Sequence, residues 1–348
     1  MTPVNFASDN TAGAHPAIMA AIARAADGRA MPYGSDPWTG GLAERFGSLF
    51  ETEVAVFPVA TGTAANALAL SALAPPWGAI YCHAAAHIQV DECGAPELFT
   101  GGAKLVPLDG ADAKLTASGF ADAMAHGGFG TVHSVQPSAV SVTQATEAGT
   151  VYAPREIADI AGIAHRHGLG VHMDGARFAN AVATLGVAPA DITWRAGVDV
   201  LSFGASKNGA IAAEAVLFFD RARAEGFAYR RKRAGHLFSK MRFLSAQLDA
   251  YLIDDLWLAN ARHANAMARR LADGLAGVPG IRLRHPVEAN AIFAHMPAAL
   301  IEGLQAEGFL FYRWPDDSAE LVRLVSAYDT HETDVDALIA AATRLAGG

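Results

Sequence analysis

The sequence predicts an α/β protein with a large domain built on a mostly parallel sheet and a smaller α+β domain after it. Its 348 residues exceed the length of a usual single domain. Apolar residues make up 52% of the chain and charged residues 18%, which supplies a sizeable core and argues against disorder. Strand-like and helix-like segments alternate up to about Lys240, an order typical of parallel strands joined by crossover helices.

The elements of the large domain follow from periodicity and from residues that begin or end helices. An apolar run predicts a strand at Glu53–Val59, and the next segment, rich in alanine and leucine, predicts a helix at Thr63–Leu73. The clearest unit is a helix that begins at Pro154 and ends at Gly168, with its isoleucines and alanines on one face. A short strand, Leu169–Met173, follows it directly.

After about Lys240 the pattern changes, and this change marks the smaller domain. A long helical region is expected at roughly Leu244–Leu275. The later elements are strands at 280–284 and 290–296, a helix near Leu300–Glu307, a strand at 321–328 and a final helix near Val335–Leu345. We therefore expect two parts, residues 1–245 with the N-terminal segment and the large domain, and residues 246–348 with the small domain.

Composition narrows the class of protein and its compartment. The net charge of −9 offers no basic surface for nucleic acid. No apolar run reaches the roughly 18–20 residues of a membrane helix, and the first ten residues do not resemble a secretory signal. Two cysteines, Cys82 and Cys93, form neither a disulfide framework nor a zinc pattern. We expect a cytoplasmic protein with no nucleic-acid or membrane partner, and no ligand cluster argues for a metal.

Ligands of such sheets bind beyond the carboxyl ends of the strands, where three groups stand out. The first is "ATGTAAN", in which Gly62 and Thr63 lie where a helix begins. Free amide groups and the positive end of the helix dipole make this a site for phosphate. Taken in isolation, these residues are more often only a turn with a helix cap.

The second group is "GVHMDGAR", which follows a buried strand. Asp174 either caps the next helix or pairs with a cation of the ligand. Arg177 either forms a structural salt bridge back to Asp174 or presents its guanidinium to a carboxylate of the ligand.

The third group is "DVLSFGASKNGA", which places Lys207 just after an apolar run. The lysine either extends into solvent or acts as an amine nucleophile that forms a Schiff base. Burial would make its proton easier to lose, which such chemistry requires. A phosphate cradle, a carboxylate for a ring nitrogen and a Schiff-base lysine are the attachments of pyridoxal 5′-phosphate. Their order at strand ends predicts an enzyme that uses this cofactor.

The same motifs resemble those of a known family. "GTAAN", "HMDGAR" and "SKNG", with "SDN" near the start and "YGSDPWT" after it, resemble the low-specificity L-threonine aldolases. These are pyridoxal-phosphate enzymes related to the β-eliminating lyases, with the aspartate aminotransferase fold. The resemblance covers nearly the whole chain. It implies cleavage of L-threonine, L-allo-threonine or related 3-hydroxy-α-amino acids, including phenylserine, to glycine and an aldehyde.

The resemblance also implies roles on the cofactor side of the site. Lys207 matches the Schiff-base lysine, and Asp174 matches the aspartate at the pyridinium nitrogen. Gly62 and Thr63 match the phosphate-binding turn, and His87 matches the histidine that stacks on the cofactor ring.

On the substrate side, Ser8, Arg177 and Arg323 match the groups that hold the substrate carboxylate. Tyr33 matches a tyrosine from a neighbouring subunit, and His133 matches a second histidine near the substrate hydroxyl. Because histidine is neutral or charged near working pH, either His87 or His133 could take the β-hydroxyl proton.

The remaining correspondences lie in segments that depart from the family pattern. Lys232 and Arg242 match basic residues that add to phosphate binding across a dimer, but "AGHLFSKMRF" replaces a glycine-rich run here. "QATEAGT" (144–150) stands where many members carry an "ENTHN"-like stretch. Contacts to the substrate hydroxyl are therefore expected to differ from those in the commoner members.

Alternatives stay open at this point. Another pyridoxal-phosphate enzyme of this fold, such as a β-eliminating lyase or an aminotransferase, would use the same cofactor attachments. A nucleotide-binding or non-catalytic protein is the least supported, because no Gly-x-Gly-x-x-Gly turn follows the first strand. A small amino acid is the expected ligand, and a shared site implies a homodimer or homotetramer.

Overall fold

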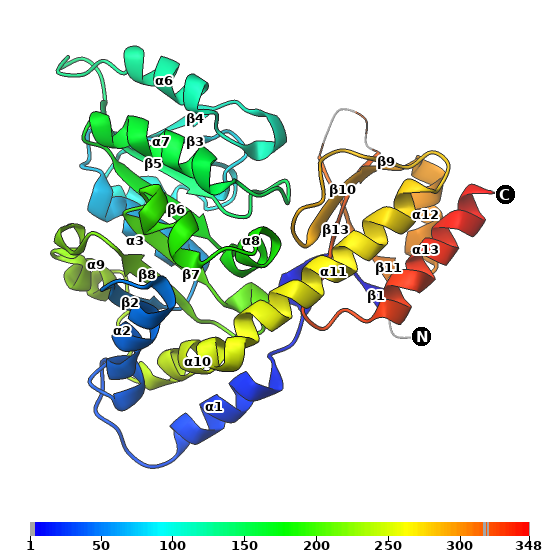
Figure 1. The fold of residues 1–348 in the computed structure, drawn as a ribbon, viewed down its shortest axis with the longest axis horizontal. Helices are drawn as coiled ribbons and strands as arrows, with labels where there is room; N and C mark the ends of the chain where they lie inside the picture. Colours follow the sequence, from blue (N-terminus) through cyan, green and yellow to red (C-terminus); the bar gives the residue numbers. More distant parts are fainter. Residues whose placement is uncertain (1–3, 316–317, 319, 348) are drawn as a thin grey trace.

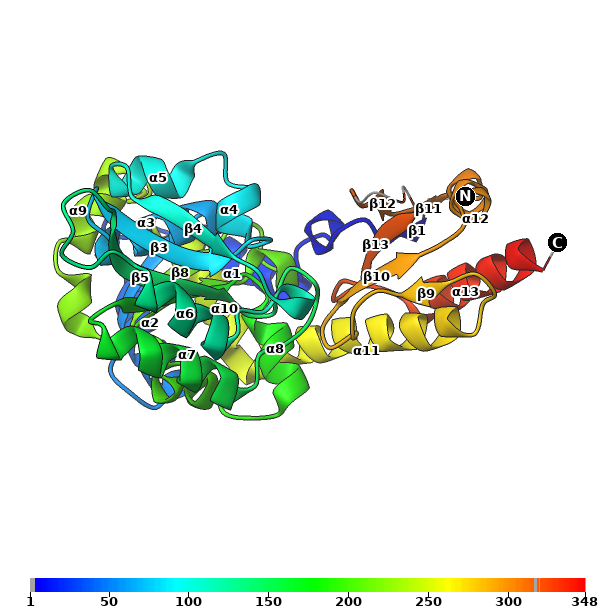
Figure 2. The same cartoon turned by 90° about the horizontal axis from the view of Figure 1, so that it is seen from above.

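The computed structural model describes residues 4–315, 318 and 320–347 and has two parts joined by a long helix (Figures 1 and 2). The larger part holds a seven-stranded sheet. In spatial order its strands are β2 (Ala55–Val59), β8 (Glu214–Phe218), β7 (Val200–Gly204), β6 (Gly170–Gly175), β5 (Gln136–Thr143), β3 (Gly78–His83) and β4 (Lys104–Leu108). Only β8 runs antiparallel to its neighbours, so the predicted α/β class with a mostly parallel sheet is confirmed.

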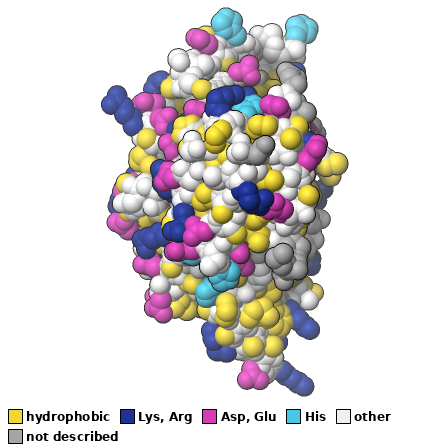
Figure 3. Space-filling model, turned by 90° about the vertical axis from the view of Figure 1, so that its right-hand side faces the viewer, with side chains coloured by type: hydrophobic (Ala, Val, Ile, Leu, Met, Phe, Trp, Pro, Cys, Tyr) yellow, Lys and Arg dark blue, Asp and Glu magenta, His cyan; other side chains and the backbone are white. Residues whose placement is uncertain are grey.

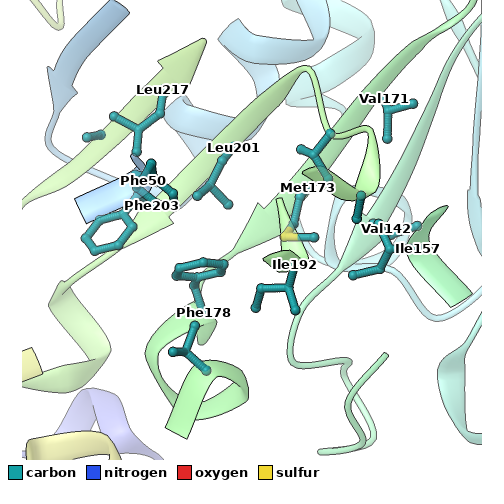
Figure 4. Packing of buried hydrophobic residues seen from close by; sticks show 14 of the residues in the cluster. Phe50, Val142, Ile157, Val171, Met173, Phe178, Ile192, Leu201, Phe203 and Leu217 are labelled. Atoms are coloured by element: carbon teal, nitrogen blue, oxygen red, sulfur yellow. The ribbon is translucent and has the colours of Figure 1, made fainter. Parts of the chain in front are cut away.

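Helices cover both faces of this sheet, because strand side chains alternate between two apolar clusters. In β3, Ala79 and Tyr81 join one cluster, whereas Ile80 and Cys82 join the other. Figure 4 shows part of the first cluster, where Met173, Leu201 and other strand side chains meet the surrounding helices. The helices of this part are α1 (Pro16–Ala26), α2 (Pro37–Phe50), α3 (Gly62–Leu73), α4 (His87–Val90), α5 (Ala95–Thr100), α6 (Ala117–Ala125), α7 (Pro154–Arg166), α8 (Phe178–Leu185), α9 (Phe227–Arg233) and α10 (Arg242–Leu252).

The smaller part is an α+β unit with its own apolar cluster. Its four-stranded antiparallel sheet has the order β12 (Tyr312–Arg313), β13 (Leu321–Val325), β10 (Ala291–His295) and β9 (Arg282–Leu283). Its helices are α11 (Leu256–Ala276), α12 (Ala298–Ala306) and α13 (Glu332–Ala346). The N-terminal strand β1 (Val4–Asn5) pairs in parallel with β11 (Phe309–Leu310), so the start of the chain belongs to this part.

The long helical region predicted at Leu244–Leu275 is two helices rather than one. Helix α10 ends at Leu252 and α11 begins at Leu256, while Asp254 and Asp255 adopt left-handed φ values of 52° and 55°. Aspartate tolerates this conformation better than most residues, which explains the break. Helix α11 then contributes Ala261 to the large cluster and later residues to the small one. The proposed division after residue 245 stays a prediction.

Among the described residues, no helix combines the length and apolar character needed to cross a bilayer. On the face of the molecule shown in Figure 3, basic side chains are interspersed with acidic and hydrophobic ones.

Candidate active site

A cavity of about 880 Å³ lies between the two parts of the molecule. The large part contributes residues that follow the carboxyl ends of its parallel strands, and the small part contributes β10, β12 and β13. Among the residues that line it are five of the predicted site residues, Ser8, His87, Arg177, Lys207 and Arg323. Side chains from both ends of the sequence therefore meet where ligands of such sheets bind.

Lys207 lies in a short turn, Ser206–Asn208, directly after β7. Burial is the main cause that lowers the pKa of its amine, and the Arg177 guanidinium adds to the effect. The carboxylates of Asp9, Asp174 and Glu214 oppose the shift without reversing it. The lysine is thus a half-buried amine that loses its proton more easily than a surface lysine, as a nucleophile requires.

Asp174 lies at the end of β6 and is only 3% exposed. Its Oδ1 accepts a hydrogen bond from the Ala176 amide at 2.9 Å, and its Oδ2 accepts one from Asn66 Nδ2 at 2.8 Å. Asn66 is a residue that the sequence reasoning missed. The sequence did contain a sign of it, because Asn66 is a single amide side chain in the alanine- and leucine-rich helix α3, which is buried along most of its length.

Asn66 connects Asp174 to the predicted stacking histidine. The same Nδ2 donates to Glu92 Oε1 at 2.8 Å, and that oxygen also accepts the bond from His87 Nδ1 at 2.8 Å. The bond to Glu92 is the largest cause that raises the pKa of His87; burial opposes it, and Asp174 adds to it. Glu92 therefore holds the imidazole, whereas the exposed Asp91 is 3.7 Å from Nε2.

Arg177 forms a salt bridge, but with Asp9 and not with Asp174 as one alternative held. Nε and Nη2 of Arg177 donate to the two Asp9 oxygens at 2.8 and 2.9 Å, a bidentate pair. Asn290 Nδ2 donates to Asp9 Oδ2 at 3.0 Å. Burial by itself would raise the pKa of Asp9, but the Arg177 guanidinium holds it below its ordinary value. Asp9 is the middle residue of "SDN", and no local pattern indicated its partner.

Arg323 and Ser8 complete the predicted carboxylate-binding group. The Arg323 guanidinium lies over the rings of Trp314 and Tyr312, 4.4 and 5.4 Å from their centres, and Nη2 donates to the Ala7 carbonyl. Its Nε is buried and has no hydrogen-bond partner among the described residues. An arginine held between aromatic rings with an unused donor is suited to bind an anion from the cavity.

Gly62 and Thr63 begin helix α3, as the phosphate hypothesis requires, with Thr61 as the capping residue. Thr61 Oγ1 accepts a hydrogen bond from the Ala64 amide at 3.2 Å. A Cβ built on Gly62 would meet no atom within 4 Å, so there is open space beside the helix N-terminus. This space and the free amide groups fit a phosphate.

The residues expected to act across subunits lie in a second place. Tyr33 and Lys232 line another hollow, where the Lys232 amine lies 4.8 Å from the centre of the Tyr33 ring. Arg242 begins α10, next to Phe243, which also lines that hollow. None of the three is among the residues that line the large cavity.

His133 is not brought to the large cavity within one chain. It lies in an exposed loop before β5, whereas the cavity lies beyond the opposite, carboxyl end of that strand. A different residue occupies the cavity wall after β5, namely Glu147 of the divergent "QATEAGT" segment. The sequence sign for Glu147 was that "QATEAGT" replaces the "ENTHN"-like stretch of many family members.

Comparisons with known proteins show the family to which the chain belongs. Residues 5–299 match the family described as beta-eliminating lyase. The chain is 44% identical over 335 residues to the low specificity L-threonine aldolase of a Pseudomonas species, with 96% of each chain covered. It is 46% identical over 325 residues to that of Pseudomonas aeruginosa, with 93% of each chain covered.

Solved structures show the same relationship in three dimensions. The structure of Leishmania major threonine aldolase superposes with a TM-score of 0.93 at 30% identity, covering 99% of this chain and 100% of that one. An aspartate aminotransferase from Rhodobacter sphaeroides shares the fold alone, with a TM-score of 0.71 at 19% identity over 100% of this chain and 93% of that one. The chain therefore belongs to the beta-eliminating lyase family, and its resemblance to the low specificity L-threonine aldolases within that family is confirmed.

Proposed function

We propose that this protein is a pyridoxal-phosphate-dependent aldolase. It cleaves L-threonine, L-allo-threonine or a related 3-hydroxy-α-amino acid to glycine and an aldehyde. The observation that carries the proposal is the cavity wall itself. A half-buried lysine with a lowered pKa stands next to an arginine–aspartate pair and a second arginine. The buried Asp174 lies near the end of β6, the strand that pairs with β7 just before Lys207.

The residues fit the cofactor at each of its polar ends. The N-terminus of α3 at Gly62 and Thr63 would hold the phosphate, Asp174 would hold the ring nitrogen, and Lys207 would hold the aldehyde carbon. His87, fixed by Glu92, would cover the ring. When bound, the cofactor supplies an electron sink for the bond that breaks at Cα.

The substrate carboxylate would be held on the small-domain side of the cavity. Arg323 offers its unused donor, Ser8 lines the wall, and Asp9 fixes the Arg177 guanidinium. Fixing the carboxylate orients the substrate, so that the Cα–Cβ bond is the one presented for cleavage.

The assembly and location are part of the proposal. Tyr33 and Lys232 line a hollow that also includes Phe243, the neighbour of Arg242, and Lys207 lines the other cavity. This separation supports a homodimer or homotetramer that completes each site with a neighbour's residues. The two free cysteines, Cys82 and Cys93, support a reducing cytoplasm.

An assay of glycine release from L-threonine, L-allo-threonine and phenylserine tests the function. We expect glycine and the matching aldehyde in equal amounts, without a keto acid. Lys207→Ala should lose both turnover and the visible absorbance of the lysine-bound cofactor. Keto-acid formation by the wild-type protein would favour an aminotransferase or β-eliminating lyase, and ordinary turnover by the variant would remove Lys207 from its role.

A further inference from the structure

Glu147 is a buried carboxyl group in the wall of the large cavity that the proposed function has not yet used. It follows β5 and lines the cavity together with His87, Arg177 and Lys207. Its Oε1 accepts hydrogen bonds from the His87 amide at 2.9 Å and from Thr143 Oγ1 at 2.8 Å. One oxygen of the carboxyl group is thus fixed by two donors, which holds the side chain in place.

The other oxygen of Glu147 has no such partner. Oε2 is buried and makes no hydrogen bond among the described residues. A buried polar atom without a partner is costly, and such atoms occur where a ligand or a reacting group supplies the missing bond. Glu147 lines the cavity and its Oε1 is already engaged by two donors, so Oε2 is the oxygen that remains for a bound substrate.

The surroundings of Glu147 also set its protonation. Burial is the largest cause that raises its pKa, and the negative charge of Asp174 adds to it, so that the pKa is about 7. The hydrogen bonds from His87 and Thr143 oppose the shift. A carboxyl group with a pKa near neutrality both takes up and releases a proton at working pH, as a general acid–base requires.

The other candidates for this proton are less suitable. His87 is held by Glu92 through its Nδ1, and its ring is the one expected to cover the cofactor. His133 lies in an exposed loop outside the cavity wall. Lys207 would be occupied by the cofactor.

We propose that Glu147 is a catalytic residue that accepts the β-hydroxyl proton of the substrate through its free Oε2. This inference rests on the proposed aldolase function. As the O–H bond gives its proton to Oε2, the C–O bond becomes the carbonyl of the aldehyde and the Cα–Cβ bond breaks. The electron pair of that bond goes to the sink that the cofactor supplies. The protonated Glu147 returns its proton to water after the aldehyde leaves, and Cα takes up one proton from water, so that glycine forms and the atoms balance.

A comparison of two reactions, threonine cleavage and exchange of the glycine α-hydrogen, isolates the transfer of the hydroxyl proton. Aldol cleavage needs a group for the hydroxyl proton, whereas exchange of the glycine α-hydrogen with deuterated water involves no hydroxyl. Glu147→Gln keeps the shape and an oxygen acceptor for His87 and Thr143 but accepts no proton. We expect it to lose about a hundredfold or more in threonine cleavage, while α-hydrogen exchange changes by less than about threefold.

Glu97→Gln is the matched control. Glu97 is also a glutamate with a buried, unpartnered Oε2, but it does not line the cavity. We expect it to leave both reactions unchanged. Glu147→Asp restores a carboxyl group at a shifted position, and we expect its ratio of cleavage to exchange to exceed that of Glu147→Gln.

A readout without turnover comes from the infrared spectrum of the cofactor-free protein. At pH 6 the wild type should show the carbonyl band of a protonated carboxyl group, and part of this band should be missing in Glu147→Gln. Titration with the cofactor should give the same visible absorbance in both proteins.

Several results would overturn the inference. Unchanged cleavage in Glu147→Gln would show that another group takes the proton. An equal loss of cleavage and exchange, or a lower cleavage-to-exchange ratio in Glu147→Asp than in Glu147→Gln, would reduce Glu147 to a structural role. Failure of the proposed function is different, because the wild-type protein itself would then not cleave threonine, whether or not it exchanges the α-hydrogen of glycine.

Discussion

Asp9 is the side chain that fixes Arg177 in the wall of the large cavity. It is 2% exposed and binds Arg177 through both of its oxygens, while Asn290 donates to one of them. Removing one partner of a buried ion pair leaves the other without compensation. Asp9 is therefore a positioning residue for Arg177.

We expect Asp9→Asn to raise KM for threonine about tenfold or more and to change kcat less, because the guanidinium loses the anion that orients it. Cofactor absorbance should stay as in the wild type. Asp249→Asn, which removes a carboxylate from a partly exposed pair with Arg45, is the control. An unchanged KM in Asp9→Asn would contradict the positioning role.

The buried His172 makes the stability of the fold depend on pH. It is fully buried between the hydroxyls of Ser141 and Ser202, at 2.8 and 2.9 Å, and burial lowers its pKa to about 4 while Asp174 opposes the shift. The unfolded chain takes up this proton below about pH 6.5, whereas the folded protein does so only near pH 4. The contribution of His172 to stability is therefore lost as the pH falls from 6.5 to 4.

Urea unfolding at pH 7.5 and 5.0 measures this contribution. The wild type should lose about 2 kcal/mol more than His172→Gln between these values, and the exposed His126→Gln should behave as the wild type. Glu147 and Glu214, whose pKa values burial raises to about 7, act in the opposite direction, so the comparison is between variants. Equal losses in the wild type and His172→Gln would refute the assignment.

Helix α3 is packed into the core of the large part and also contributes residues to the candidate active site. Its N-terminus begins beside the open space at Gly62, and its buried face carries Asn66 to Asp174. Its 12 residues are mostly buried, so the helix cannot move without disturbing the core. The proposed phosphate site is consequently held by a rigid element.

A side chain at Gly62 should test that site. We expect Gly62→Val to weaken cofactor binding at least about tenfold, because the side chain would enter the space that fits the phosphate. Melting of the cofactor-free protein should change little. Gly162→Val, in the outer part of α7 where a Cβ would meet only Arg166, controls for a β-branched residue in a helix. Equal cofactor affinity in both variants would rule out the phosphate site.

The same elements show what the sequence could predict. Asp174 and Lys207 were found because each follows an apolar strand, and strand ends of a parallel sheet converge. Asp9 and Asn66 were missed because their partners lie 168 and 108 residues away, and no local pattern encodes such pairs. The break between α10 and α11 was missed because two aspartates at a kink resemble an ordinary helix surface.

At the scale of the whole molecule, we expect each active site to be completed by residues of a neighbouring subunit. The hollow that Tyr33 and Lys232 line, next to the start of α10, is separate from the cavity that contains Lys207. In a twofold dimer, the same surface of each subunit faces the other, so each site would receive this group from its neighbour.

Mixing two inactive variants tests this arrangement. Lys207→Ala and Arg242→Ala should each have little activity alone. After co-refolding, mixed dimers contain one intact site, and activity should recover to roughly a quarter of the wild-type value. Equal stability of both variants is the control, and no recovery in verified mixed dimers would place Arg242 in its own subunit's site.

The pairing of β1 with β11 has a practical consequence. Residues 4–9 connect the two parts of the molecule. Strand β1 at their start pairs with β11 of the small part, and Asp9 at their end binds Arg177 of the large part. An extension or a deletion just before residue 4 would therefore disturb the large cavity, because only a few residues separate that point from Asp9. Purification tags are better fused after α13, whose last turn lies on the far side of the small part.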